Sequence, residues 1–239
     1  MINLLSAGCS FVYGAELSDS PDPLGNNKPS NKSWVSLYAN KKGYNHITEA
    51  TCGISNVGIA RKVISAVENE VVDKVIVQWT FIDRFELRWN NDNYQTFAWW
   101  NSKDYSTDNK FVNEFRGKNK ANTEIATLWY KNIHSKNTAY YYYIKSKVEL
   151  GNYLNFKKIP YVFLDAENIE IPKTDDIYIN SYTNISKNFN NLSFDGMGFY
   201  DWATNNNFPV GNEGHPLDEA HRAAFELIQQ DLDEKLNIF

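Results

Sequence analysis

One stretch near the N-terminus decides the fold: Ile2-Asn3-Leu4-Leu5-Ser6-Ala7-Gly8-Cys9-Ser10-Phe11-Val12-Tyr13-Gly14. Residues 2–7 have the length and apolar content of a buried strand. Gly8 and Gly14 then allow tight turns on either side of Ser10. A hydroxyl at the carboxyl end of a parallel strand lies where open α/β sheets bind ligands. The plain alternative is that Ser10 caps the helix that follows it.

Apolar runs and helical patterns alternate along the rest of the chain. Further strands are expected at 44–51, 73–80 and 158–165, with a short fifth strand or edge at 176–180. Helices are expected at 33–39, from 55 or 56 to 67, at 122–155 with a break at Gly151, and at 218–236. Strands separated by helices predict a parallel sheet covered on both faces. We therefore expect an α/β fold, a three-layer, flavodoxin-like α/β/α sandwich, formed by residues 1–239 as a single domain.

The segment at about 85–120 interrupts this pattern. It has no regular period, and its many aromatic residues lie among Asn, Asp and Lys. A long irregular segment inside a compact domain is usually a functional insertion, so we expect a lid or a wall of the substrate site. The alternative is a small aromatic cluster that packs on the surface of the domain.

The charge and apolar content of the chain limit the classes of partner that it is expected to bind. The net charge is −5 with both signs mixed along the chain and no basic stripe, which argues against nucleic acid as a partner. No run approaches the roughly 18 apolar residues of a membrane-spanning helix, and we expect a soluble, cytoplasmic protein. The 15 Tyr, 14 Phe and 7 Trp favour walls that face a sugar or another partner, besides the core.

The chain has two cysteines, Cys9 and Cys52. Two cysteines form no disulfide framework, so a reducing compartment is expected. Each cysteine precedes the residue that ends a predicted strand region, and the first two strands of such folds are usually neighbours. We predict reduced, largely buried thiols at the base of the site, without a catalytic role.

A second motif stands near the C-terminus: Gly211-Asn212-Glu213-Gly214-His215-Pro216-Leu217-Asp218-Glu219-Ala220-His221-Arg222. A serine after the first strand and a His-Pro in the last loop resemble the SGNH (GDSL-type) hydrolase family. That family has Gly-Asp-Ser near its start and Asp-x-x-His-Pro near its end. Here Cys9 stands where the first Asp is usual. The resemblance implies an SGNH hydrolase-like fold, with Ser10 as nucleophile and His215 as general base.

The resemblance also implies a place for an oxyanion. The family binds it with backbone N–H groups, one from a glycine that corresponds to Gly53, and with an Asn side chain after the third strand. This chain has no Asn there. Thr80 or Gln78 would have to supply a hydrogen-bond donor, and Arg84 a charge.

The acid that orients the histidine is the second departure. In the family it is an Asp three residues before the His, and here that position is Asn212. An Asn can hold the ring but cannot stabilise the imidazolium as a carboxylate does. We predict that Asn212 orients His215, with Glu213 as the alternative. No metal and no cofactor are expected.

Three functions remain open. The first is a serine ester hydrolase that acts on a small-molecule or carbohydrate-linked acyl ester. The second is a catalytically silent, carbohydrate-binding module, and the third is a structural component of a larger assembly. Divergent chains of this kind are familiar from phage genomes, so a virion is the alternative location. Contact between Ser10 and His215 would favour the first function.

Overall fold

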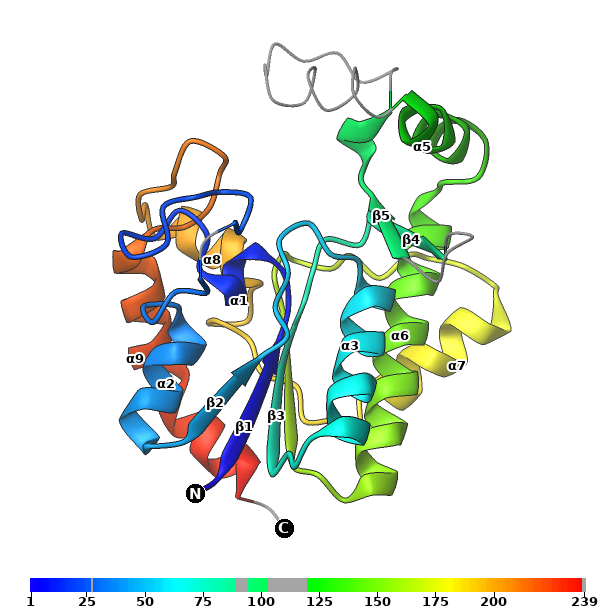
Figure 1. Ribbon diagram of the computed structural model, residues 1–239. Coiled ribbons are helices and arrows are strands. Elements are labelled where there is room, and N and C mark those ends of the chain that lie inside the picture. Colours follow the sequence, from blue (N-terminus) through cyan, green and yellow to red (C-terminus); the bar gives the residue numbers. More distant parts are fainter. Residues whose placement is uncertain (27, 89–93, 103–119, 238–239) are drawn as a thin grey trace.

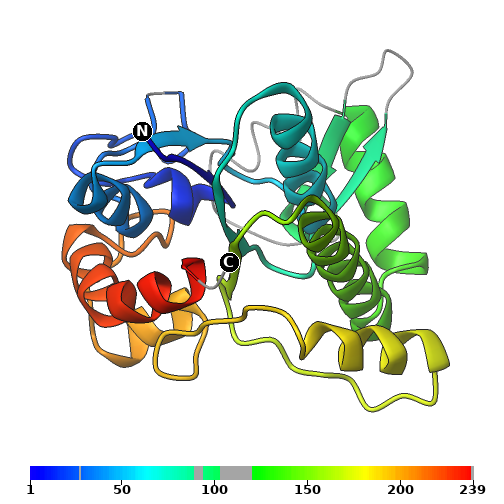
Figure 2. The same ribbon diagram turned by 90° about the horizontal axis from the view of Figure 1, so that it is seen from below.

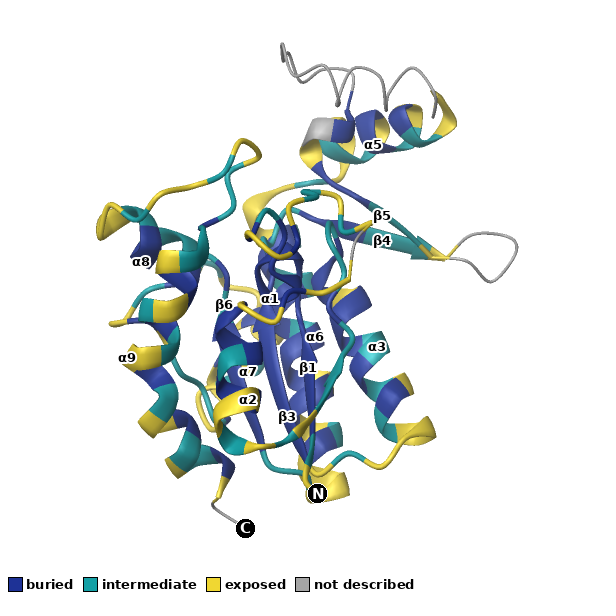
Figure 3. Ribbon diagram, turned by 60° about the vertical axis from the view of Figure 1, so that its left-hand side comes forward, coloured by how far each residue is buried: buried dark blue, intermediate teal, exposed yellow. Residues whose placement is uncertain are grey.

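The structure is a computed structural model that describes residues 1–26, 28–88, 94–102 and 120–237 (Figure 1). Its centre is a parallel sheet with the strand order β2-β1-β3-β6. The strands are β1 (Asn3–Ala7), β2 (Asn45–Thr48), β3 (Lys74–Trp79) and β6 (Tyr161–Asp165). All six residues of β3 are buried, because this central strand is covered on both faces (Figure 3).

Helices cover both faces of the sheet (Figures 1 and 2). One face carries α1 (Ser10–Tyr13), α2 (Trp34–Lys42), α8 (Phe199–Asn205) and α9 (Asp218–Leu236). The other carries α3 (Asn56–Asn69) and α6 (Lys136–Lys157), with α7 (Ile177–Ser186) packed outside α6. The predicted three-layer α/β/α sandwich is therefore confirmed. No helix in these described ranges is long and apolar enough to cross a membrane.

Two predicted elements are wrong. The expected strand at 176–180 is the start of helix α7, because the Asp176 carboxylate accepts the N–H groups of Tyr178 and Ile179 and caps a helix. The expected helix 122–155 is two helices, α5 (Lys120–Asn132) and α6, and the break is at Ser135, which caps α6. Gly151 instead lies inside α6, where the ring of Phe189 packs directly against its backbone.

The described part of the aromatic insertion forms a small cluster of its own. Strands β4 (Phe85–Arg88) and β5 (Tyr94–Phe97) make an antiparallel hairpin, followed by the short helix η1 (Trp99–Asn101). Phe85 stacks on Phe97 and on Trp129 of α5, with ring centroids 4.8 and 4.1 Å apart. These contacts are those of the packed cluster named as the alternative. Residues 89–93 and 103–119 lie outside the described residues, and the lid stays a prediction.

Candidate active site

Several candidate residues lie in the segments that follow the carboxyl ends of the parallel strands, which we call the open edge of the sheet. Ser10 begins α1 directly after β1, and Gly53 follows β2 with φ +77°, a conformation that favours glycine. The space above Gly53 is open, since a Cβ there would meet nothing within 4 Å. In the part of the chain that the structure describes, the backbone N–H groups of Ser10 and Gly53 donate no hydrogen bond. Both are thus available to an external acceptor.

The side chains predicted to replace the absent Asn are placed differently from one another. Gln78 is fully buried within β3, its amide has no hydrogen-bond partner among the described residues, and its role in binding substrate stays a prediction. Thr80 is also fully buried, and its hydroxyl oxygen accepts from Nη1 of Arg84 at 2.9 Å. The guanidinium of Arg84 lies over the ring of Phe81, 5.0 Å from the ring centroid. Arg84 is therefore a fixed positive charge at this edge.

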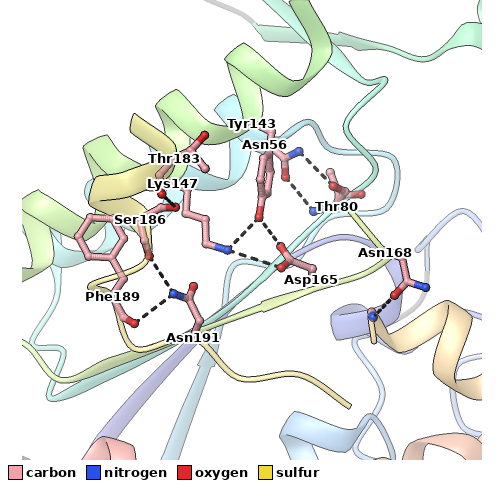
Figure 4. A network of polar contacts seen from close by, with 11 residues as sticks. Asn56, Thr80, Tyr143, Lys147, Asp165, Asn168, Thr183, Ser186, Phe189 and Asn191 are labelled. Carbon is pink, nitrogen blue, oxygen red and sulfur yellow. Dashed lines mark hydrogen bonds and ion pairs between the residues drawn. The ribbon is translucent and has the colours of Figure 1, made fainter. Parts of the chain in front are cut away.

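Polar clamps hold the loops of the edge together (Figure 4). The amide of Asn56 donates to the carbonyl of Thr80 at 3.0 Å and accepts its N–H at 2.8 Å, which joins the start of α3 to the end of β3. Arg84 Nη1 adds a bond to the carbonyl of Ile54 at 3.3 Å. From the sequence, Asn56 is only a possible start of the helix that ends near residue 67. Its partner follows a different strand, and no local pattern points to it.

A second clamp fixes the end of β6 (Figure 4). The hydroxyl of Tyr143 donates to Asp165 and accepts from Nζ of Lys147, both at 2.8 Å. Burial, followed by the charge of Asp165, raises the pKa of Tyr143 well above its usual value, so the hydroxyl stays protonated. Farther along, Asn168 accepts the N–H of Gly198, which holds the loop after β6 against the start of α8.

Phe11, next to Ser10, packs against the loop between α8 and α9 that carries His215, which we call the histidine loop. Its ring stacks on Tyr200 and meets Phe81 and His215 edge-on, with centroids 6.1, 5.8 and 5.8 Å away. His215 thus packs against the residue next to Ser10. Within the described chain the Ser10 hydroxyl makes no hydrogen bond, His215 included. Catalytic hydrogen bonds are often long without a substrate, and direct contact between Ser10 and His215 stays a prediction.

The group on the other ring nitrogen of His215 is Glu16. Its Oε2 lies 2.7 Å from Nδ1 of His215, and the two side chains are 9% and 13% exposed. The prediction that Asn212 or Glu213 orients the ring is therefore corrected. Residues 211–214 form a tight turn, in which the N–H of Gly214 donates a hydrogen bond to the carbonyl of Gly211. Asn212 and Glu213 lie exposed at the tip of this turn, while Glu16 enters at its base.

Both histidines of the last motif are neutral near pH 7. Burial lowers the pKa of His215 below its usual 6.5, against the hydrogen bond and charge of Glu16, which raise it. The ring is then free to accept a proton at neutral pH. His221 is fully buried, and burial lowers its pKa to about 3. Its Nδ1 accepts the backbone N–H of Trp34 at 3.1 Å, so His221 has a structural role.

The two thiols give a first testable prediction. Both are free; Cys9 is buried, and burial raises the pKa of Cys52 to about 12. Only the thiolate attacks a disulfide reagent, so at pH 8 Cys52 holds on the order of 10³-fold less reactive form than an ordinary cysteine. We expect negligible reaction of the folded protein with a chromogenic aromatic disulfide and two equivalents after unfolding. Rapid release of two equivalents from the folded protein would contradict this.

Comparisons with known proteins place this geometry in a known fold. A scan against protein-family models and a search of curated proteins found no match. Among solved structures, the chain is similar to the psychrotrophic esterase EstA from Pseudoalteromonas sp., with 12% identity, TM-score 0.53, and 99% of this chain and 100% of that one covered. It is also similar to a carbohydrate esterase family 2 enzyme of Corynascus thermopiles (Myceliophthora fergusii), with 13% identity, TM-score 0.51, and 98% and 66% covered.

A third similar structure is described as a carbohydrate esterase whose active site has divergent catalytic and non-catalytic binding functions. It is 10% identical, with TM-score 0.50, and the match covers 99% of this chain and 70% of that one. At such identities the likeness concerns the fold. The chain has the SGNH hydrolase-like fold that the resemblance of its two sequence motifs implied.

Proposed function

We propose that this chain is a serine ester hydrolase in which Ser10 is the nucleophile and His215 the general base. The observation that carries the proposal is the state of His215. Its ring is largely buried, is held at Nδ1 by a carboxylate 2.7 Å away, and packs against the residue next to Ser10. Acyl transfer requires a buried, neutral and oriented imidazole that reaches the serine, and the first three of these features support the proposal.

The reaction follows from these positions. Ser10 Oγ attacks the ester carbonyl while Nε2 of His215 takes the hydroxyl proton. The backbone N–H groups of Ser10 and Gly53 donate hydrogen bonds to the negatively charged oxygen of the tetrahedral intermediate. His215 returns the proton to the leaving alcohol, and an acyl-serine remains. Water, deprotonated by His215, then attacks this ester, so that the carboxylic acid leaves and Ser10 regains its proton.

The substrate class is a small or carbohydrate-linked acyl ester. Phe81 and Tyr200 are half-buried aromatic rings beside Phe11 and supply flat apolar walls. The similar structures include esterases named for carbohydrate substrates, which supports a carbohydrate-linked acyl ester as substrate.

A second candidate is a carbohydrate-binding module without turnover. The absence of an Asn side chain where the family supplies its third oxyanion donor favours it, because one such donor contributes about 2.7–4 kcal/mol to lowering the barrier. The similar esterase described with non-catalytic binding functions is a precedent on the same fold. The candidate differs from the first in the reactivity of Ser10.

Covalent labelling separates the two candidates. An aryl alkylphosphonate transfers its phosphonyl group to an activated serine and releases the phenol; EstA is described as inhibited by monoethylphosphonate. We expect release of one equivalent of phenol and one phosphonyl adduct, found by mass spectrometry on the peptide that contains Ser10. An unlabelled protein that still binds acetylated oligosaccharides would support the binding module instead.

The pH dependence of turnover gives a second prediction. His215 must be neutral to act as a base, and burial lowers its pKa below 6.5. The rate of turnover therefore falls as the pH drops through that lowered pKa, and it reaches its maximum above it. We expect kcat/KM for an aryl acetate to be level between about pH 7 and 8 and to reach half its maximum below 6.5. A half-maximal pH above 7 would contradict this assignment of the base.

A further inference from the structure

We propose that Glu16, six residues after the nucleophile, is the acid that orients His215 and stabilises its protonated form, so that the site is a Ser10–His215–Glu16 triad. The inference rests on the proposed function. It departs from the family pattern, in which the acid precedes the histidine in the same loop. Glu16 acts through His215 and is therefore a positioning residue.

The carboxylate of Glu16 is bound by the whole histidine loop. Besides Nδ1 of His215, it accepts the backbone N–H of Glu213 at 3.1–3.2 Å and that of His215 at 3.4 Å. Three donors converge on one largely buried carboxylate, and charge-assisted hydrogen bonds are strong when they are shielded from water. Proton transfer to Nε2 would place a positive charge beside this carboxylate.

The histidine loop leaves room for this carboxylate at one residue. A Cβ built on Gly211 would lie 2.6 Å from the carboxyl carbon and from Oε2 of Glu16. The backbone of Gly211 has no positive φ, so its glycine is explained by space and not by conformation. Any side chain at 211 would displace Glu16 from the ring of His215.

The segment that carries Glu16 is held from two sides. Gly14 ends α1 in the left-handed conformation, and Glu16 itself has φ +64°, which is unusual for a residue with a side chain. Two residues later, Ser18 donates from its N–H and hydroxyl to Asp218, at 3.0 and 2.5 Å. Asp218, in the first turn of α9, therefore anchors the segment that carries Glu16.

Four charged or titratable groups act on His215 from the surrounding elements. Glu16 and Glu213 raise its pKa, while Arg84, after β3, lowers it. His221 of α9 also interacts with His215, and burial keeps His221 neutral near pH 7. Of the two acids, Glu16 contributes more and also makes a hydrogen bond. Removing its charge would thus make His215 a weaker base.

The test is Glu16→Gln in the full chain, with Glu219→Gln, an exposed residue in the first turn of α9, as the matched control. Loss of the acid in a serine triad costs about 10⁴-fold in kcat, and we expect a fall of that order with KM within a few-fold of wild type. The acid limb of kcat/KM should move to lower pH, since the charge that raises the pKa of His215 is gone. Glu16→Asp should regain at least about tenfold over Glu16→Gln, because it restores the charge.

The outcomes separate the two proposals. If wild type is labelled at Ser10 and hydrolyses aryl esters while folded Glu16→Gln does so equally well, the triad is wrong and the serine hydrolase stands. If wild type does neither, the proposed function itself fails. A second measurement covers misfolding: the Nδ1–H proton of His215 should be visible by proton NMR in wild type and lost in Gly211→Ala. Its absence from wild type would overturn the role of Glu16.

Discussion

Ser10→Ala is expected to abolish turnover of an activated aryl ester, by about 10⁶-fold or down to the uncatalysed rate, whichever is reached first. Removal of the serine of a triad has an effect of this size, because the oxyanion donors and substrate binding that remain contribute only a small part of the acceleration. Ser10 is 5% exposed, and its hydroxyl makes no hydrogen bond in the described chain. The loss is therefore chemical, and the melting temperature should barely change.

Ser6→Ala is the matched control, because it should give the opposite result. Ser6 is fully buried in β1, and its hydroxyl lies 2.7 Å from Nε2 of His46. Deleting it leaves a largely buried ring nitrogen unpaired, which costs about 1–3 kcal/mol of stability. Turnover per folded molecule should be unchanged. Measuring kcat and thermal unfolding for both variants decides the matter: a Ser10→Ala protein that keeps wild-type kcat contradicts the assignment of the nucleophile.

His215→Asn is expected to lower kcat by a similar factor of about 10⁶. The asparagine amide offers a donor close to the position of Nδ1, so the bond to Glu16 can persist while the base at Nε2 is removed. The two N–H groups of the loop still bind the Glu16 carboxylate, so the fold should be retained. The effect should thus fall on proton transfer.

The double variant Ser10→Ala, His215→Asn gives the stronger version of this prediction. Nucleophile and base act as one unit, so removing both should cost no more than removing either. Steady-state turnover of the two single variants and the double variant measures this directly. A double variant clearly slower than each single variant would mean that Ser10 and His215 act independently, and the proposed pair would be wrong.

Asn212→Asp is a further consequence of the structure. From the sequence it would restore the family's acid and raise activity. Asn212 is exposed at the tip of the turn, and Nδ1 of His215 is already bound to Glu16. We therefore expect no gain in kcat. The sequence position relative to the histidine was correct for the family pattern, but here the loop folds so that this position faces solvent.

Local chemistry explains which elements were predictable. The strand before Ser10, the apolar run at 73–80 and the last helix each carry their pattern within a few residues, and all three are present. Residues 176–180 were misread because Ile177, Tyr178 and Ile179 have strand propensity. The capping carboxylate of Asp176 decided otherwise, and it stands in the sequence as a helix signal that apolar content outweighed.

The sequence by itself determined the parallel α/β architecture, because the alternation of strands and helices follows from local periodicity. It also put Ser10, Gly53 and His215 in segments that follow or lie between these elements, which such a sheet gathers at one edge. Only the tertiary structure decided the partner of His215. Glu16 is 199 residues from His215, and its approach depends on a positive φ, a serine anchored to α9 and the missing side chain of Gly211. A hydrogen bond depends on distance in space, and no spacing along the chain encodes that distance.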